Sequence, residues 1–258
     1  MEIKYIYIYI MKNIGVLIPA TTKNRDWTTF RETDLYEHLF NSFFKTYNKE
    51  HIYTIYLGID VNDRFYTKHE NQEEIIRFIS VMTNTNIKFI NFDRKWNGNV
   101  CHIWNELHRI AFDENNDYFV QIGSDIRFMS EGWVNSCIQK LDENDGVGVV
   151  GLTDEGRRVM NPNDTLLTQT FVSREHMKIF NFYYPPDFKN WFIDDWISEI
   201  YELNNFKFIV PHKIFNLGGE PRYKIYGDRG LCTENVIKYK DHINTYLNLQ
   251  EKIDNYKG

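Results

Sequence analysis

The amino-acid sequence predicts an α/β fold in which a mostly parallel sheet has helices on both faces. Short apolar runs alternate with segments of helical spacing over residues 12–126. The chain has 258 residues, enough for one full-sized core. It shows no internal repeat, low-complexity block or linker composition. We therefore expect a single domain whose ligands bind at the carboxyl ends of the strands.

The first half of the chain shows the alternation most clearly. Residues 14–18 form an apolar run that stops before a proline, as a buried strand does. Leu35, Leu39 and Phe43 fall on one helical face, and residues 97–99 (Asn-Gly-Asn) form a turn and helix cap. We expect strands at residues 14–18, 52–59, 87–92 and 118–122, and helices at residues 32–47, 70–82 and 100–112.

The second half is less regular. We expect strands at residues 147–150 and 166–172, and helices at residues 174–180, 194–204 and 233–256. At the start, Ile and Tyr alternate over residues 1–10. This pattern is typical of a strand, or of an N-terminal extension over residues 1–11 ahead of a true start at Met11.

Composition and charge exclude several classes of protein. The chain has 30 Lys and Arg against 36 Asp and Glu, so it lacks the cationic excess of a general nucleic-acid-binding protein. A hydrophobic content of 42% excludes a disordered chain. No apolar run reaches the ~20 residues that span a bilayer, and no secretory cleavage site is present. The three cysteines form no metal or disulfide pattern, so we expect a reducing, cytoplasmic location.

Polar side chains follow each of the first four predicted strands. The segments after them are residues 19–25, 60–63, 93–96 and 123–126. Because parallel strands present their carboxyl ends at one edge of a sheet, these groups are expected to lie together. Loops are polar in any protein, but four such loops at one edge favour a binding site.

Two acidic groups are the sharpest candidates for chemistry. Asp125 directly follows the fourth strand, where a carboxylate can bind a divalent cation that bridges a diphosphate, although a helix-capping role fits equally well. Asp194 and Asp195 lie among aromatic residues, which limit solvation and raise a carboxylate pKa towards that of a general base. Adjacent helical residues face different ways, so at most one points into a cleft. Alternatively, both cap the following helix.

These segments resemble GT-A-type glycosyltransferases near family 2. Residues 14–19 with Thr21, Asn24 and Arg25 resemble the opening nucleotide-binding strand and loop, and Gly123-Ser124-Asp125-Ile126 stands in the place of the family's D-x-D motif. The similarity covers residues 12–230. A more specific likeness, to a subgroup of large DNA viruses and some protists that includes chlorella-virus rhamnosyltransferases, is carried by residues 168–176, 179–180, 184–186, 189–191 and 194–197.

The resemblance implies a metal-dependent, inverting hexosyl- or rhamnosyl-type transfer from a nucleotide-sugar, with a UDP-sugar favoured, to a hydroxyl of a glycan or glycoprotein. It implies a nucleotide-binding half over residues 12–126, an acceptor half over residues 127–230 and a C-terminal helix over residues 231–258. If the chain is viral, the implied location is the host cytoplasm. The implied nucleotide-binding residues are Pro19, Thr21, Arg25, Asp60, Asn99 and Ser124.

The resemblance also implies the remaining site residues. Asp195 is expected to be the general base, with Asp194 in reserve. The acceptor is expected to contact Trp191, Trp196 and His176, although core packing explains the two indoles equally well. The expected ligands of Mn²⁺ or Mg²⁺ are Asp125 and His212.

One departure from the family keeps two alternatives open. Many relatives carry two acidic residues where this chain has Ser124 and Asp125, so Asp125 is the main expected protein ligand, with diphosphate oxygens and waters completing the shell. The absence of a second charge at Ser124 favours a non-catalytic sugar-binding relative. The other alternative is a nucleotidyltransferase that forms a nucleotide-sugar; such enzymes usually need a Gly-rich, basic loop after the first strand, and this loop has no Gly.

Overall fold

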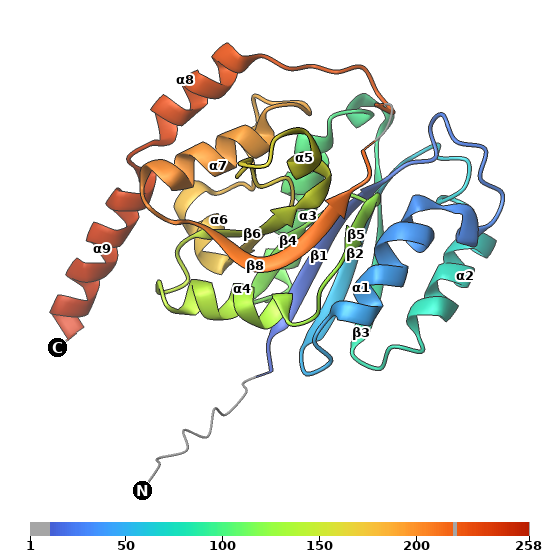
Figure 1. The fold of residues 1–258 in the computed structure, drawn as a ribbon, viewed down its shortest axis with the longest axis horizontal. Helices are drawn as coiled ribbons and strands as arrows, with labels where there is room; N and C mark the ends of the chain where they lie inside the picture. The colour runs from blue at the N-terminus through green and yellow to red at the C-terminus, as the bar shows by residue number, and fades with distance from the viewer. Residues whose placement is uncertain (1–10, 219–220, 258) are drawn as a thin grey trace, which may run out of the picture.

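The computed structural model describes residues 11–218 and 221–257. Its strands are β1 (Asn13–Ala20), β2 (Ile52–Asp60), β3 (Thr85–Phe92), β4 (Tyr118–Gln121), β5 (Ile126–Phe128), β6 (Val149–Asp154), β7 (Thr170–Ser173) and β8 (Lys207–Asn216). They form one mixed sheet of order β3-β2-β1-β4-β7-β6-β8-β5, which runs through both halves of the chain (Figure 1). The strand or extension predicted for residues 1–10 lies outside the described residues.

Helices cover the sheet on both sides. They are α1 (Asn41–Thr46), α2 (His69–Ile79), α3 (Val100–Asp113), α4 (Trp133–Asp142), α5 (Glu155–Met160), α6 (Arg174–Phe180), α7 (Ile193–Leu203), α8 (Arg229–Tyr239) and α9 (His242–Lys257). Three short helical segments complete the chain: η1 (Phe30–Glu32), the π-helix η2 (Leu35–Phe40) and η3 (Arg94–Trp96).

Alternating side chains of β1 explain the two layers of helices. Ile14, Val16 and Ile18 belong to a core that also contains buried residues of η2, α1, α2 and α4. Leu17 points to the opposite side and belongs to a core formed with α3, α6, α7 and α8. Because successive strand residues face opposite sides of a sheet, one apolar strand serves both cores.

The four strands predicted in the first half are confirmed. β3, β2, β1 and β4 pair in parallel, so the ends of these strands reach the same edge of the sheet. The predicted cap is also confirmed, because the side-chain oxygen of Asn99 accepts a hydrogen bond of 3.0 Å from the backbone N–H of His102 at the start of α3.

The second half contains elements that the sequence did not predict, including α4, α5, β5 and β8. β8 pairs in parallel with β6, but Pro211 and His212 are skipped where the register shifts. A proline and a bulge interrupt the alternation on which strand prediction depends. The predicted strand over residues 166–172 is shorter than expected, since β7 begins only at Thr170.

The single helix predicted for residues 233–256 is wrong, because the chain forms α8 and α9 there. The break falls between Tyr239 and His242, whose rings both pack against Phe180. These ring contacts hold the segment around the break against α6.

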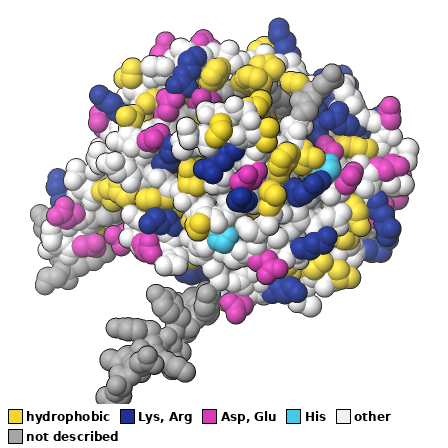
Figure 2. Space-filling model, viewed as in Figure 1, with side chains coloured by type: hydrophobic (Ala, Val, Ile, Leu, Met, Phe, Trp, Pro, Cys, Tyr) yellow, Lys and Arg dark blue, Asp and Glu magenta, His cyan; other side chains and the backbone are white. Residues whose placement is uncertain are grey.

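The surface is mixed in charge on the face that Figure 2 shows, where Lys and Arg side chains are interspersed with Asp and Glu. In the described part of the chain, no helix is both long and apolar enough to span a membrane.

Candidate functional site

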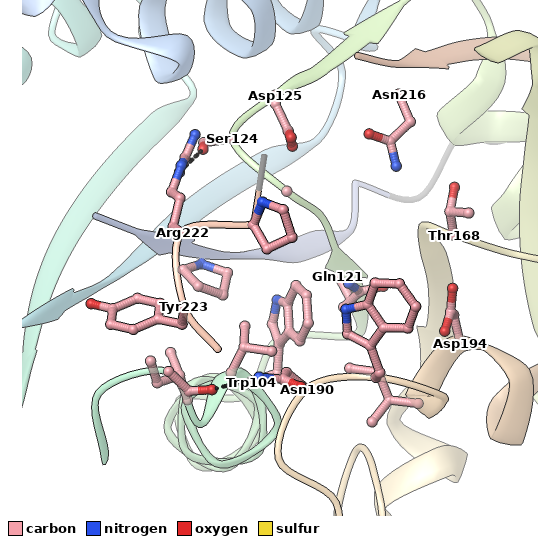
Figure 3. Close-up of a pocket in the computed structure, with 18 of the residues that line it drawn as sticks. Trp104, Gln121, Ser124, Asp125, Thr168, Asn190, Asp194, Asn216, Arg222 and Tyr223 are labelled. Atoms are coloured by element: carbon pink, nitrogen blue, oxygen red, sulfur yellow. Dashed lines mark hydrogen bonds between the residues drawn. The ribbon is translucent and has the colours of Figure 1, made fainter. Parts of the chain in front are cut away.

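A cavity of about 620 Å³ opens at the carboxyl ends of β1, β2 and β4. Its wall includes Thr21, Asp60 and Asp125 from the segments at the ends of these strands, so the predicted meeting of strand ends is found for three of the four. β8 adds Asn216 at its own end. Figure 3 shows Arg222 and Tyr223 on one side of the cavity and Asp194 and Thr168 on the other.

Asp60 is a buried carboxylate at the end of β2. One oxygen, Oδ2, accepts a hydrogen bond from the hydroxyl of Tyr223. The other, Oδ1, is buried without a hydrogen-bond partner in the described residues. Burial raises the pKa of Asp60, and the Tyr223 contact partly offsets that rise. An unpaired buried acceptor costs free energy, so a rearrangement that brings an N–H donor to Oδ1 would be favoured.

Asp63 fixes the shape of the loops beside Asp60. Its carboxylate accepts hydrogen bonds from the backbone N–H of Thr22 at 2.6 Å and from the backbone N–H groups of Phe65 and Tyr66 at 3.0 and 2.9 Å. It thereby ties the loop after β1 to the loop after β2. Asp63 is a positioning residue for the segment that contains Thr21.

Arg222 reaches the ends of β1 and β4 from the segment that follows β8. Its guanidinium donates to the carbonyl oxygen of Thr21 at 3.5 Å and to the hydroxyl of Ser124 at 3.4 Å, and it forms an ion pair with Asp34. Burial raises the pKa of Asp125, and the nearby charge of Arg222 lowers it in part. This side of the cavity therefore contains a fixed cation beside a carboxylate.

The residues present do not fit a protein-built metal site. Over residues 11–218 and 221–257, no group of three or more His, Cys, Asp and Glu side chains is arranged to hold a metal ion. Asp125 contributes one carboxylate, and its neighbour Ser124 is engaged by Arg222. The prediction that His212 is a metal ligand is wrong: its ring lies between the hydroxyls of Ser136 at 2.9 Å and Ser130 at 3.3 Å, outside the cavity.

The two adjacent carboxylates at the start of α7 have different surroundings. Asp195 pairs with Arg229, with 3.0 Å between Oδ1 and Nη1. Asp194 has no ion-pair partner among the described residues, and Figure 3 shows its carboxylate beside Thr168 at the cavity. Burial, followed by the charge of Asp195, raises the pKa of Asp194 to about 6. The geometry therefore favours Asp194 over Asp195 as a proton acceptor.

Two of the three predicted acceptor contacts are wrong. Trp196 is 0% exposed and packs in the core against Phe180 and Tyr239. His176 is also buried, and its ring nitrogens lie 2.8 Å from the hydroxyl of Tyr201 and 3.0 Å from the carbonyl oxygen of Tyr183. Trp191 differs from both, because it is 50% exposed and lines the cavity.

Of the remaining predicted residues, some line the cavity and one caps a helix next to it. Pro19, Arg25 and Ser124 line the cavity with Thr21 and Asp60. Asn99 does not line it and acts as the cap of α3.

Several cavity residues were missed by sequence reasoning. Asn190 connects three segments: its Nδ2 donates to the carbonyl oxygens of Gly98 at 3.1 Å and Lys224 at 3.0 Å, and its Oδ1 accepts from the N–H of Tyr226 at 2.9 Å. The sequence carries no periodic signal for such contacts, since they join chain segments that are far apart. The other missed residues include Trp104, Thr168, Gln169, Asn216, Arg222 and Tyr223.

Comparison with solved structures shows the fold. The chain is similar to S. aureus TarS 1–349 in complex with UDP-GlcNAc, with a TM-score of 0.54, 15% identity and 87% of this chain covered. It is also similar to a second crystal structure of S. aureus TarS 1–349, with a TM-score of 0.53, 14% identity and 80% of this chain covered. This chain spans 64% and 60% of those two structures. The similarity confirms the predicted GT-A-type α/β fold. No protein-family model and no curated protein sequence matches the chain.

Proposed function

We propose that the protein is a glycosyltransferase that moves a sugar from a nucleotide-sugar to an acceptor hydroxyl. The observation that carries this proposal is one cavity with a buried, half-satisfied carboxylate, Asp60, at the end of β2 and a carboxylate of raised pKa, Asp194, at the start of α7. A UDP-sugar is the favoured donor. The structure of S. aureus TarS with UDP-GlcNAc supports that choice through the shared fold.

The nucleoside occupies the side of the cavity formed by β1 and β2. The carboxylate of Asp60, which lines the cavity and has one oxygen without a partner among the described residues, accepts a hydrogen bond from a base N–H. Pro19, Thr21 and Arg25, which line the same cavity, contact the nucleoside and its phosphates. Lys23 also lowers the pKa of Asp60 and helps to keep that carboxylate charged.

Asp194 acts as the general base. It accepts the proton of the acceptor hydroxyl while the hydroxyl oxygen bonds to the anomeric carbon. The bond from that carbon to the diphosphate oxygen breaks, and its electron pair leaves with the diphosphate. Asp195 is held by Arg229 and positions the start of α7. The second carboxylate beside the base, Asp195, is paired with Arg229 and is not assigned as a nucleophile, so the proposed reaction is a single displacement with inversion, by the logic used for glycosidases.

The acceptor approaches past Trp191. This indole is exposed at the wall of the cavity, and the apolar face of a sugar packs well on such a ring. The acceptor is therefore a hydroxyl of a glycan or glycoprotein, and the transferred group is a hexosyl or rhamnosyl sugar. A location in the cytoplasm, or in the host cytoplasm for a viral chain, belongs to this proposal.

Calorimetric titration with UDP, GDP and dTDP tests the proposal. We expect one nucleotide, UDP first, to bind the parent protein, and a screen of sugars on that nucleotide to find a donor that is consumed. If none of the three nucleotides binds, with or without Mn²⁺, the glycosyltransferase proposal is wrong.

A non-catalytic sugar-binding relative is the second candidate, because Ser124 stands in place of a second acid. It predicts that the nucleotide or a sugar binds but that no donor is consumed with any acceptor. Turnover that Asp194→Asn abolishes, with UDP binding retained, would exclude this candidate.

A further inference from the structure

We infer that Arg222 binds the diphosphate of the donor and supplies the positive charge that a divalent cation supplies elsewhere in this fold. The inference rests on the proposed function, since it assumes a nucleotide-diphosphate donor. The fold leads us to expect a bound divalent cation, but the side chains found in the cavity do not form a site for one.

The side chains around Asp125 in the cavity are a poor fit to a metal ion. Asp125 is a single carboxylate, and residues 11–218 and 221–257 contain no cluster of three acidic, His or Cys side chains suited to a metal. Mg²⁺ at such sites is bound through one or two carboxylates together with substrate phosphates and waters, so Asp125 alone gives the lower limit of side-chain ligands. The side chains around Asp125 thus provide fewer ligands for a cation than a metal site built from protein side chains does.

Arg222 lies between the ends of β1 and β4. Its guanidinium contacts the carbonyl oxygen of Thr21 at the end of β1 and the hydroxyl of Ser124 after β4. These are the strand ends between which a donor bound through Asp60 directs its phosphates. Figure 3 shows Arg222 joined to Ser124 beside Asp125. Its side chain is only 17% exposed, so water screens its charge weakly.

The guanidinium group is chemically suited to bind a diphosphate. Arg presents a planar fork of N–H donors that matches phosphate oxygens in pairs, and it stays charged at every working pH. When the anomeric bond breaks, negative charge grows on the diphosphate oxygen that receives the electron pair. Donors fixed in place before the reaction stabilise this charge without reorganisation.

Asp34 fixes Arg222 in place. The two side chains form an ion pair across 188 positions of sequence, and Asp34 also lies 3.8 Å from Nε2 of His38. Only one arm of the guanidinium is engaged by Asp34, whereas the other arm reaches Thr21 and Ser124. The arm on Thr21 and Ser124 makes long hydrogen bonds of 3.5 and 3.4 Å, which a phosphate oxygen would replace with shorter ones.

The test compares UDP with uridine, which lacks the phosphates. UDP binding is measured by calorimetry in EDTA and in Mn²⁺, and uridine binding by ligand-observed NMR, on the parent, Arg222→Gln and Arg222→Lys. Arg109→Gln is the matched control, because Arg109 pairs with Glu106 and Asp113 on α3 and does not line the cavity.

We expect the parent to bind UDP in EDTA with a dissociation constant within about threefold of that in Mn²⁺. Arg222→Gln should weaken UDP binding by about tenfold or more, since a hydrogen bond to a charged group contributes about that factor, and should leave uridine binding unchanged. Arg222→Lys, which keeps the charge without the fork, should lie between the two. If Arg222→Gln does not fold, the Lys variant carries the comparison.

Two results would overturn the inference while leaving the proposed function in place. One is UDP binding that occurs only with Mn²⁺ and is insensitive to Arg222→Gln. The other is an equal loss of UDP and uridine binding in Arg222→Gln, which would mark Arg222 as a structural residue. If the parent binds neither ligand under any condition, the proposed function fails and this inference fails with it.

Discussion

The hydroxyl of Tyr223 donates a hydrogen bond to the carboxylate of Asp60 across 163 positions of sequence. This contact places the segment after β8 against the end of β2. Burial raises the pKa of Tyr223 well above its usual range, and the contact with Asp60 raises it further, so the phenol stays a donor. It satisfies one carboxylate oxygen and leaves Oδ1 without a partner in the described chain. The side of the cavity formed by β1 and β2 is therefore assembled from both halves of the chain.

Asp60→Asn tests the role of this carboxylate in base recognition. We expect the dissociation constant for UDP to rise by about tenfold or more, because a hydrogen bond to a charged acceptor contributes about 1.5–3 kcal/mol. CDP is the matched ligand, since cytosine has no ring N–H to donate at that position, and its weaker binding should change by less than about twofold. Calorimetry measures both. Equal losses for UDP and CDP would contradict base recognition by Asp60.

Asp194→Asn tests the general base. We expect kcat to fall by about 100-fold or more, as is typical when a general base is removed, while UDP binding stays within about twofold. Asp195→Asn should cost less, because Asp195 acts through its contact with Arg229. Initial rates at saturating donor, together with calorimetry, separate these effects. The opposite ranking of the two variants would make Asp195 the base.

The pH dependence of turnover follows from the raised pKa of Asp194. A base works in its charged form, so kcat/KM should rise with pH through an apparent pKa of about 6 and then level off. The charge of Asp195 contributes to that raised pKa. Asp195→Asn should therefore move the midpoint to lower pH, whereas the control Arg109→Gln should leave it in place. A profile that is flat from pH 5 to 8 would argue against Asp194.

Buried His108 predicts a loss of stability in acid. Neither ring nitrogen of His108 has a partner in the described residues, and burial lowers its pKa well below 6.5, with the nearby His176 and Arg174 adding to the effect. The unfolded chain binds a proton at this site below pH 6.5 and the folded chain does not. Unfolding is therefore favoured as the pH falls, by up to about 1.4 kcal/mol per pH unit for each such group.

Replacement of the His108 ring tests its contribution to the pH dependence of stability. His108→Leu loses no hydrogen bond, and it should flatten the dependence of the unfolding free energy on pH between 6.5 and 5, as measured by urea denaturation. His69→Gln is the control, because His69 is exposed on α2 and should leave the slope unchanged. An unaltered slope in His108→Leu would show that other groups dominate the acid response.

The two tryptophans at the start of α7 should separate stability from acceptor binding. Trp196→Ala removes a fully buried indole and should destabilise the fold by about 3–5 kcal/mol. Trp191→Ala should change stability by less than about 1 kcal/mol and should raise KM for the acceptor, with UDP binding unchanged. Chemical denaturation and acceptor titrations measure the two effects. A normal KM in Trp191→Ala would remove Trp191 from the acceptor site.

Local pattern was sufficient for the strands of the first half, whereas the single helix predicted for residues 32–47 is divided into η2 and α1 and begins only at Leu35. The strands at β1 to β4 and the cap of α3 depend on apolar runs and on a single Asn, and each of these features acts within a few residues of itself. The pattern failed at β8, where Pro211 and His212 drop out of the pairing, and at the break between α8 and α9. In neither place does the local apolar pattern mark the interruption.

In the candidate site, too, some features follow from local sequence and others from long-range packing. The order of residues alone shows that polar groups follow the first four strands, and the parallel direction of those strands predicts that the groups meet at one edge. Asp194 and Asp195 both line the cavity, and only long-range contacts show that Arg229 pairs with Asp195 and leaves Asp194 without an ion-pair partner among the described residues. The burial of Trp196 and the exposure of Trp191 also depend on tertiary packing. It alone brought Arg222 to Ser124. The physical reason is that periodicity sets the faces of an element, whereas long-range packing sets which face meets the cavity and which distant segment completes it.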